Sequence, residues 1–143
     1  MTTQEIEMCR EVQKTAEAGI KTIEALTDMV QDDALSMQLA RQTLCYSELY
    51  QEAARELLNA KAEGYRSTVI EDAKRRAEIH YHTLLNTSTA HLAELIMRGS
   101  MIGILEMEKG LKRHENISTQ TEKLARQMIA MEQKNLLCLK QYL

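Results

Sequence analysis

The residues of this chain that could bind a metal ion are acidic and histidine side chains spaced three apart on predicted helices. A carboxylate and an imidazole at that spacing lie on one helix face and can reach the same ion. His91 and Glu94 have this spacing, but in reversed order and near a helix start. Glu48 and Glu132 are each followed three residues later by an amide instead of a histidine. We therefore predict no catalytic residue, no cofactor and no metal; a degenerate metal site would use Glu48, Glu132, Glu94 and His91.

The amides suggest a structural polar layer instead. Ser47, Gln51, Glu132 and Asn135 fall on the predicted inward faces of two helices, near the middle of each. A buried carboxylate needs donors, because an unpaired buried charge becomes protonated or destabilises the fold. The neighbouring hydroxyl of Tyr50 could add another donor without any cation. We predict that this layer is metal-free and fixes helix register.

Other combinations carry weaker signals. Glu78 and His82 are four residues apart, but two ligands make a weak site, and we interpret both as solvated. Residues 95–100 resemble the phosphorylated-histidine motif of histidine phosphotransfer domains, yet Leu95 stands where the histidine would be, which excludes phosphotransfer in this form. The cysteines have no C-x-x-C spacing and are expected to be small core residues: Cys9, Cys45 and Cys138.

Three glycines lie within a stretch that otherwise has the pattern of a long amphipathic helix. Glycine inside a helix costs about 1 kcal/mol relative to alanine. Gly99, Gly103 and Gly110 are therefore predicted to allow close packing against a neighbour.

Composition favours an all-α protein. The 143 residues include no proline and only five glycines, and no segment alternates like a strand. The net charge of −3 is interspersed and aromatic residues are few, which argues against nucleic-acid binding. No signal peptide or long apolar run is present, so we expect no membrane association and a cytoplasmic location.

The expected architecture is a single domain, 1–143, built as a four-helix bundle of two antiparallel hairpins joined by a long, partly helical crossover. Capping boxes and polar breaks predict the following segments: helices at about 3–29, 34–63, 88–114 and 119–142, and a crossover at 65–86 with a short helix at about 69–85. The second helix is predicted to end at a left-handed Gly64. Its inward stripe is predicted to be Met37, Ala40, Leu44, Ser47, Gln51, Ala54 and Leu58.

These helix lengths and the single long crossover resemble the ferritin-like superfamily. The segment from His91 to Asn135 is also similar to a group of small uncharacterised bacterial proteins of this build, which lack the di-metal ligands. The resemblance implies a fold but no activity. Our leading hypothesis is a non-enzymatic bundle that acts through its surfaces or through self-association as a homo-oligomer, for which we expect a dimer. The alternative is a ferritin-like protein that binds a metal or small ligand at a degenerate mid-bundle site.

Overall fold

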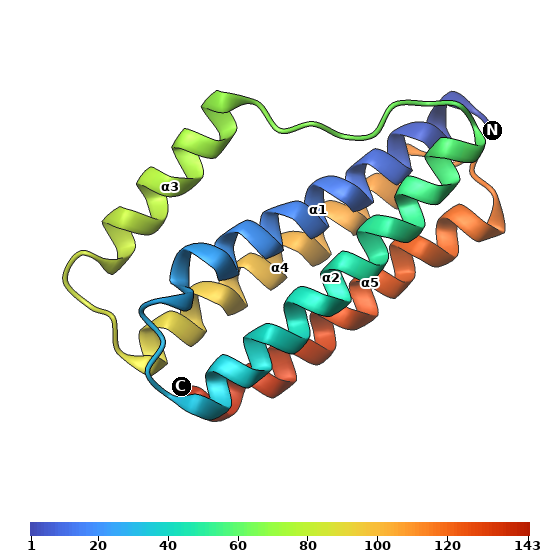
Figure 1. Cartoon of the computed structure of the whole chain (residues 1–143). Helices are drawn as coiled ribbons and strands as arrows, with labels where there is room; N and C mark the ends of the chain where they lie inside the picture. The colour runs from blue at the N-terminus through green and yellow to red at the C-terminus, as the bar shows by residue number, and fades with distance from the viewer.

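The computed structural model describes residues 1–143 and contains helices and no strands, which confirms the all-α class (Figure 1). The elements are α1 (Thr3–Thr27), α2 (Asp33–Asn59), α3 (Val69–Thr83), α4 (Thr89–Arg113), α5 (Thr119–Leu139) and a final 3₁₀ turn, η1 (Lys140–Tyr142). No helix combines the length and the apolar character needed to cross a membrane.

Polar residues fix where each α-helix begins. The five N-cap side chains each accept a hydrogen bond from a backbone N–H in the first turn: Thr2, Asp32, Thr68, Ser88 and Ser118. At α1 the box is complete, because Glu5 also accepts from the backbone N–H of Thr2. The short breaks between helices are therefore local properties of the sequence.

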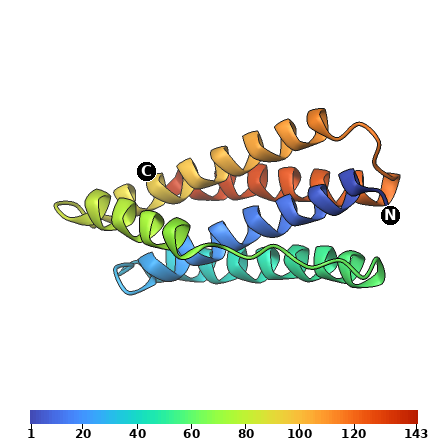
Figure 2. The same cartoon turned by 90° about the horizontal axis from the view of Figure 1, so that it is seen from above.

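Four helices, which we call the bundle, lie side by side: α1, α2, α4 and α5. The hairpin pairs α1–α2 and α4–α5 pack most extensively, and α1–α4 and α2–α5 close the remaining sides. Figures 1 and 2 show α1 and α5 running in one direction and α2 and α4 in the other. The crossover returns along the bundle and carries α3, which lies outside the core against α1.

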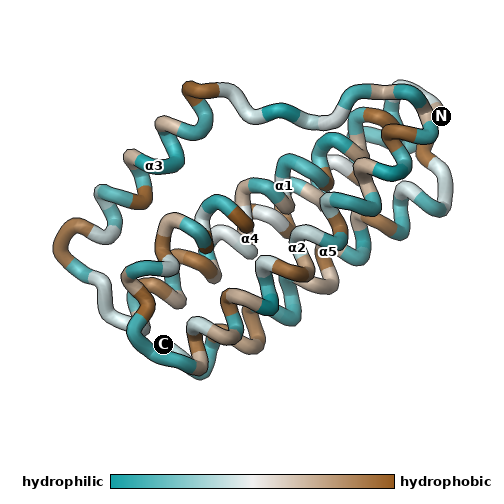
Figure 3. Tube along the Cα trace, viewed as in Figure 1, coloured by the Kyte–Doolittle hydropathy of each residue, from teal (hydrophilic) through white to brown (hydrophobic).

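The bundle core consists of aliphatic, methionine and alanine side chains from all four helices, with Tyr46 as its one buried aromatic ring. Of the cysteines, only Cys9 is a core residue, and burial raises the pKa of its thiol to about 11. Cys45 is exposed and Cys138 is half-buried, so the expectation of core cysteines is wrong for these two. Figure 3 shows further hydrophobic residues at both ends of α3, where they are exposed.

The inward stripe predicted for α2 is wrong. Met37, Leu44 and Leu58 are exposed. The buried residues of α2 are instead Leu35, Leu39, Gln42, Tyr46, Leu49, Ala53 and Leu57. Both sets have helical spacing and differ by only one or two positions, so periodicity alone does not tell which one faces the core.

The end of α2 also differs from its prediction. The helix stops at Asn59, four residues before the predicted bound, and Lys61 adopts the left-handed conformation (φ 55°) expected of Gly64. The N–H of Ala62 bonds to the carbonyl of Leu57, and that of Lys61 to Leu58, which is the Schellman pattern. Gly64 has no positive φ; it packs over the buried side chain of Gln13.

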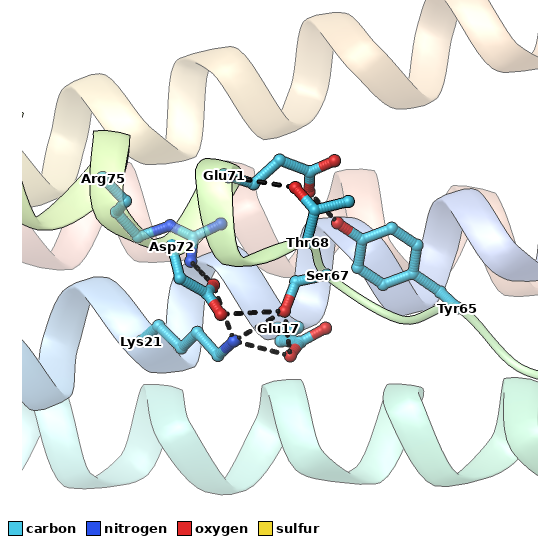
Figure 4. A network of polar contacts seen from close by, with 8 residues as sticks. All are labelled: Glu17, Lys21, Tyr65, Ser67, Thr68, Glu71, Asp72 and Arg75. Atoms are coloured by element: carbon cyan, nitrogen blue, oxygen red, sulfur yellow. Dashed lines mark hydrogen bonds and ion pairs between the residues drawn. The ribbon is translucent and has the colours of Figure 1, made fainter.

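The crossover is tied to α1 by polar contacts. The Arg10 Nε donates to the carbonyl of Glu63 at 2.8 Å, and Gln13 Oε1 accepts from the N–H of Tyr65 at 2.8 Å. Further along, Lys21 Nζ donates to Ser67 Oγ and Asp72 Oδ1, each at 2.9 Å (Figure 4). These contacts hold α3 alongside α1.

Candidate functional site

The carboxylate of Glu132 is the centre of the candidate site. It lies on α5 and is 1% exposed. Its Oε1 accepts three hydrogen bonds: from Tyr46 Oη on α2 at 2.5 Å, from Ser100 Oγ on α4 at 3.1 Å and from Asn135 Nδ2 at 3.4 Å. Its Oε2 accepts none. The two oxygens of one buried carboxylate are thus in different environments.

Burial dominates the electrostatics of this group. Removal from water raises the pKa of Glu132 to about 7, although the hydrogen bonds from Tyr46, Ser100 and Asn135 act in the opposite direction. The pKa of Tyr46 is raised as well, by burial and by the adjacent carboxylate, so the phenol keeps its proton and serves as a donor. Glu132 can therefore change its charge near neutral pH.

Two glycines leave the space that the Tyr46 and Glu132 side chains occupy. A Cβ at Gly19 on α1 would lie 2.5 Å from the Tyr46 ring, and one at Gly103 on α4 would overlap Oε2 of Glu132. One heptad later, a Cβ at Gly110 would overlap a carboxylate oxygen of Glu11. Gly103 and Gly110 therefore make room for carboxylates rather than for a neighbouring backbone.

Gly99 corrects the prediction of three packing glycines. It is exposed, and an added Cβ would meet nothing within 4 Å. It lies on α4 one turn before Gly103. Gly99 therefore faces solvent and does not allow close packing in the core.

A cleft of about 610 Å³ leads from the surface to this site between α1 and α4, beneath α3. Ile23, Ile96 and Met107 contribute apolar wall, and Tyr46 and Glu132 lie at its floor. The rim and the side facing α3 are charged, with Glu11, Lys14, Glu106 and Arg113 from the bundle and Glu71, Lys74, Arg75 and Glu78 from α3. A molecule in the cleft would meet Oε2 of Glu132 at its deepest point.

The polar network between α1 and α3 holds one side of this cleft (Figure 4). Lys21 bridges Glu17 on its own helix and Asp72 on α3, both at 2.9 Å. The Asp72 carboxylate has a lowered pKa, mainly through its hydrogen bond with Lys21, and the pKa of Lys21 is raised by the same bond. Next to it, Tyr65 Oη donates to Glu71 Oε2 at 2.5 Å.

The structure brings together only half of the predicted polar layer. Glu132 and Asn135 are buried and in contact, but Ser47 is half-buried, Gln51 is exposed, and neither bonds to Glu132. Their predicted places are taken by Tyr46 and Ser100. The reason is the rotation of α2, which turns Tyr46 inward one residue away from Ser47.

The four residues of the alternative metal site do not converge. His91 Nδ1 and Glu94 Oε2 lie 3.7 Å apart at the start of α4, while Glu48 is exposed on α2 and Glu132 is buried in mid-bundle. No group of three or more acidic, histidine or cysteine side chains is arranged to hold an ion. On α3, Glu78 and His82 are both exposed.

Sequence reasoning missed Tyr46, Ser100 as a donor, and Gly19. Ser100 did carry a signal, because it shares a helix face with Gly103, and small residues there indicate space for something large. Gly19 lies on the stripe of α1 in the same way. Tyr46 carried no such mark, since an aromatic residue with a hydroxyl is common at half-exposed positions.

Comparison with solved structures shows a protein of similar fold. No family model matches the sequence, and no curated protein matches it. A solved structure, the crystal structure of a DUF305 fragment from Deinococcus radiodurans, superposes with a TM-score of 0.77 over 98% of this chain and 95% of that one. The two chains are 13% identical, so this similarity shows a shared fold alone.

Proposed function

We propose that this protein is a non-enzymatic binding protein that holds a small molecule in the cleft between α1 and α4. The observation that carries the proposal is the asymmetry of Glu132: Oε1 accepts three protein hydrogen bonds and Oε2, which faces Gly103, accepts none. The fully enclosed side-chain atoms without a partner are Glu11 Oε2 and both amide atoms of Gln42, so Oε2 of Glu132 is open to the cleft. A donor brought by a ligand would complete this carboxylate.

The lining of the cleft supports a particular ligand chemistry. Apolar wall residues surround an anionic floor, a combination that suits a short aliphatic group ending in an ammonium or another strong donor. A charged donor to a buried carboxylate forms a stronger hydrogen bond than a neutral one. The proposed ligand class is therefore a small amine with an apolar body.

The arrangement of polar groups also favours binding over catalysis. Tyr46, Ser100 and Asn135 all donate to the same oxygen, which holds the carboxylate in one orientation. Ser100 has a carboxylate and no imidazole as its partner, so it lacks the base that activates a serine nucleophile. These groups position an acceptor.

We also propose that the fold is a ferritin-like four-helix bundle. Two antiparallel hairpins, a crossover that spans the bundle length and helices of 21 to 27 residues support a ferritin-like four-helix arrangement. The departure from the di-metal members is chemical: where they need a cluster of ligands, this chain has Tyr46, Ser100 and Asn135 around a single carboxylate.

The test is an NMR titration of the protein with n-butylammonium, using butyrate and n-butanol as probes of the same body but different charge. We expect saturable shifts of the Gly103, Ser100 and Gly19 amides with n-butylammonium. Affinity should rise as pH increases through about 7 and level off above it, because ionised Glu132 binds the cation better.

Glu132→Gln is the informative variant, and Glu108→Gln, which changes an exposed carboxylate outside the cleft, is its matched control. Loss of the shifts in Glu132→Gln alone would support the proposal. Equal shifts with butyrate, or shifts that survive in Glu132→Gln, would overturn it.

A further inference from the structure

The outer face of α2 carries a continuous row of residues that the bundle does not bury. Met37, Leu44 and Leu58 are 59%, 65% and 75% exposed. The whole row, which we call the outer seam, is Met37, Ala40, Leu44, Ser47, Gln51, Ala54 and Leu58. This is the set of residues that the hydrophobic pattern predicted to be the core.

The spacing of the outer seam is that of a coiled-coil interface. Its steps alternate strictly between three and four residues from Met37 to Leu58, a 3.5-residue repeat that keeps one face toward a partner helix. Large and small residues also alternate, with Met, Leu, Gln and Leu at one position of the heptad and Ala, Ser and Ala at the other. In an antiparallel pair of such helices, each large residue meets a small one.

Charges flank the outer seam on one edge only. Arg41, Glu48 and Arg55 recur every seven residues next to it and are all exposed. The corresponding positions on the other edge are Thr43, Tyr50 and Leu57, which carry no charge. In coiled coils, residues at these flanking positions select partner, orientation and register.

We propose that the partner of this face is α2 of a second copy of the chain, packed antiparallel about a two-fold axis between Leu44 and Ser47. In this register Leu44 meets the partner's Ser47, and Arg41 meets the partner's Glu48. By symmetry both contacts occur twice.

Charge selects this register over the neighbouring one. A shift of one heptad would bury the same number of seam layers, but it would bring Arg41 against the partner's Arg55 and Glu48 against the partner's Glu48. Like charges at such positions repel. In a parallel pair the charged edge of one helix would lie against the uncharged edge of the other, so no ion pair would form between the helices. The polar Gln51 inside the seam further favours one register.

One pair of helices in contact forms a small interface, so the dimer should dissociate on dilution. The experiment is sedimentation equilibrium of the full chain over a wide concentration range, in reducing buffer because Cys45 is exposed. We expect a reversible monomer–dimer equilibrium. Leu44→Glu should abolish the dimer, whereas Leu105→Glu, at a similarly exposed leucine of α4, should leave it unchanged.

Charge reversal tests the register directly. Arg41→Glu alone, or Glu48→Arg alone, should weaken the dimer about tenfold, because two attractive pairs become repulsive. The double variant Arg41→Glu/Glu48→Arg should have a dimer dissociation constant within about threefold of the parent's. A parent that stays monomeric, a dimer that resists Leu44→Glu, or a double variant no tighter than either single one would overturn the proposal. Circular dichroism of each variant checks that the helices are intact.

Discussion

Tyr46 Oη on α2 donates to Glu132 Oε1 on α5 at 2.5 Å, inside the bundle and between two glycines. The contact joins the two hairpins at mid-length through a single oxygen. Because the phenol keeps its proton, the bond persists whether Glu132 is ionised or neutral. Its strength changes with that charge, since a hydrogen bond to an ionised acceptor is about twice as strong as a neutral one.

The raised pKa of Glu132 makes stability depend on pH. The folded protein holds this proton up to about pH 7, whereas an unfolded glutamate releases it near pH 4.3. Between these two pH values the folded state therefore binds more protons than the unfolded state. The free energy of unfolding of the parent should fall as pH rises from about 4.3 to 7, by on the order of 3 kcal/mol relative to Glu132→Gln. Urea unfolding of both proteins between pH 5 and 8 measures this difference. A constant difference across the range would contradict the assignment.

Gly103 and Gly99 on α4 should respond in opposite ways to substitution by alanine. Gly103→Ala would push Oε2 of Glu132 away from its position and bring Thr15 Cγ2 within 3.2 Å, so we expect a loss of about 1–3 kcal/mol. Gly99→Ala is the control, because its Cβ meets open space and the better helix former should add up to about 1 kcal/mol. Chemical denaturation measures both. Equal stability of the two variants would show that the Glu132 carboxylate moves freely.

Gln42 places two unpaired polar atoms in the core. Its side chain is 1% exposed, and neither Oε1 nor Nε2 has a hydrogen-bond partner. Gln42→Met keeps nearly the same volume and removes both unpaired groups, so it should raise the free energy of unfolding by about 1–3 kcal/mol. Gln127→Met, on the exposed face of α5, should change it little. A destabilised Gln42→Met would mean that a buried water bonds this amide.

The tether of α3 gives a fourth prediction. Lys21→Met removes the bonds to Ser67 and Asp72, which hold the start of α3 on α1. Hydrogen–deuterium exchange of α3 amides should become several-fold faster, while the bundle helices stay protected, because exposed ion pairs contribute at most about 1 kcal/mol. Lys109→Met, which breaks only a local pair with Glu106, is the control. Unchanged exchange in α3 would show that other contacts hold it.

Local chemistry made the helix starts predictable. Each N-cap is a Thr, Ser or Asp that bonds within its own first turn, so no distant residue is involved. The break before Thr89 follows from the same rule. The end of α2 was less predictable, because Lys61 adopts a left-handed conformation that usually marks glycine.

The rotation of α2 could not be predicted, because two of its faces have apolar residues at helical spacing. One face holds Leu35, Leu39 and Leu57, and the other holds Met37, Leu44 and Leu58. The choice depends on long-range contacts, above all the fit of Tyr46 under Gly19 and against Glu132. The prediction with the wrong rotation of α2 placed Ser47 and Gln51 in the site, where the structure has Tyr46.

The crossover has a consequence for how this chain could be divided. It is the only covalent link between two hairpins, residues 1–62 and 89–143, and each hairpin contains both of its helices and the cap that ends α2. Core residues from both halves are buried against each other, so the halves have complementary surfaces. Produced as two separate polypeptides, they should recombine one to one into a complex whose NMR spectrum retains the Gly19 and Gly103 signals of the parent. The bundle and its cleft would then form only where both halves are present together.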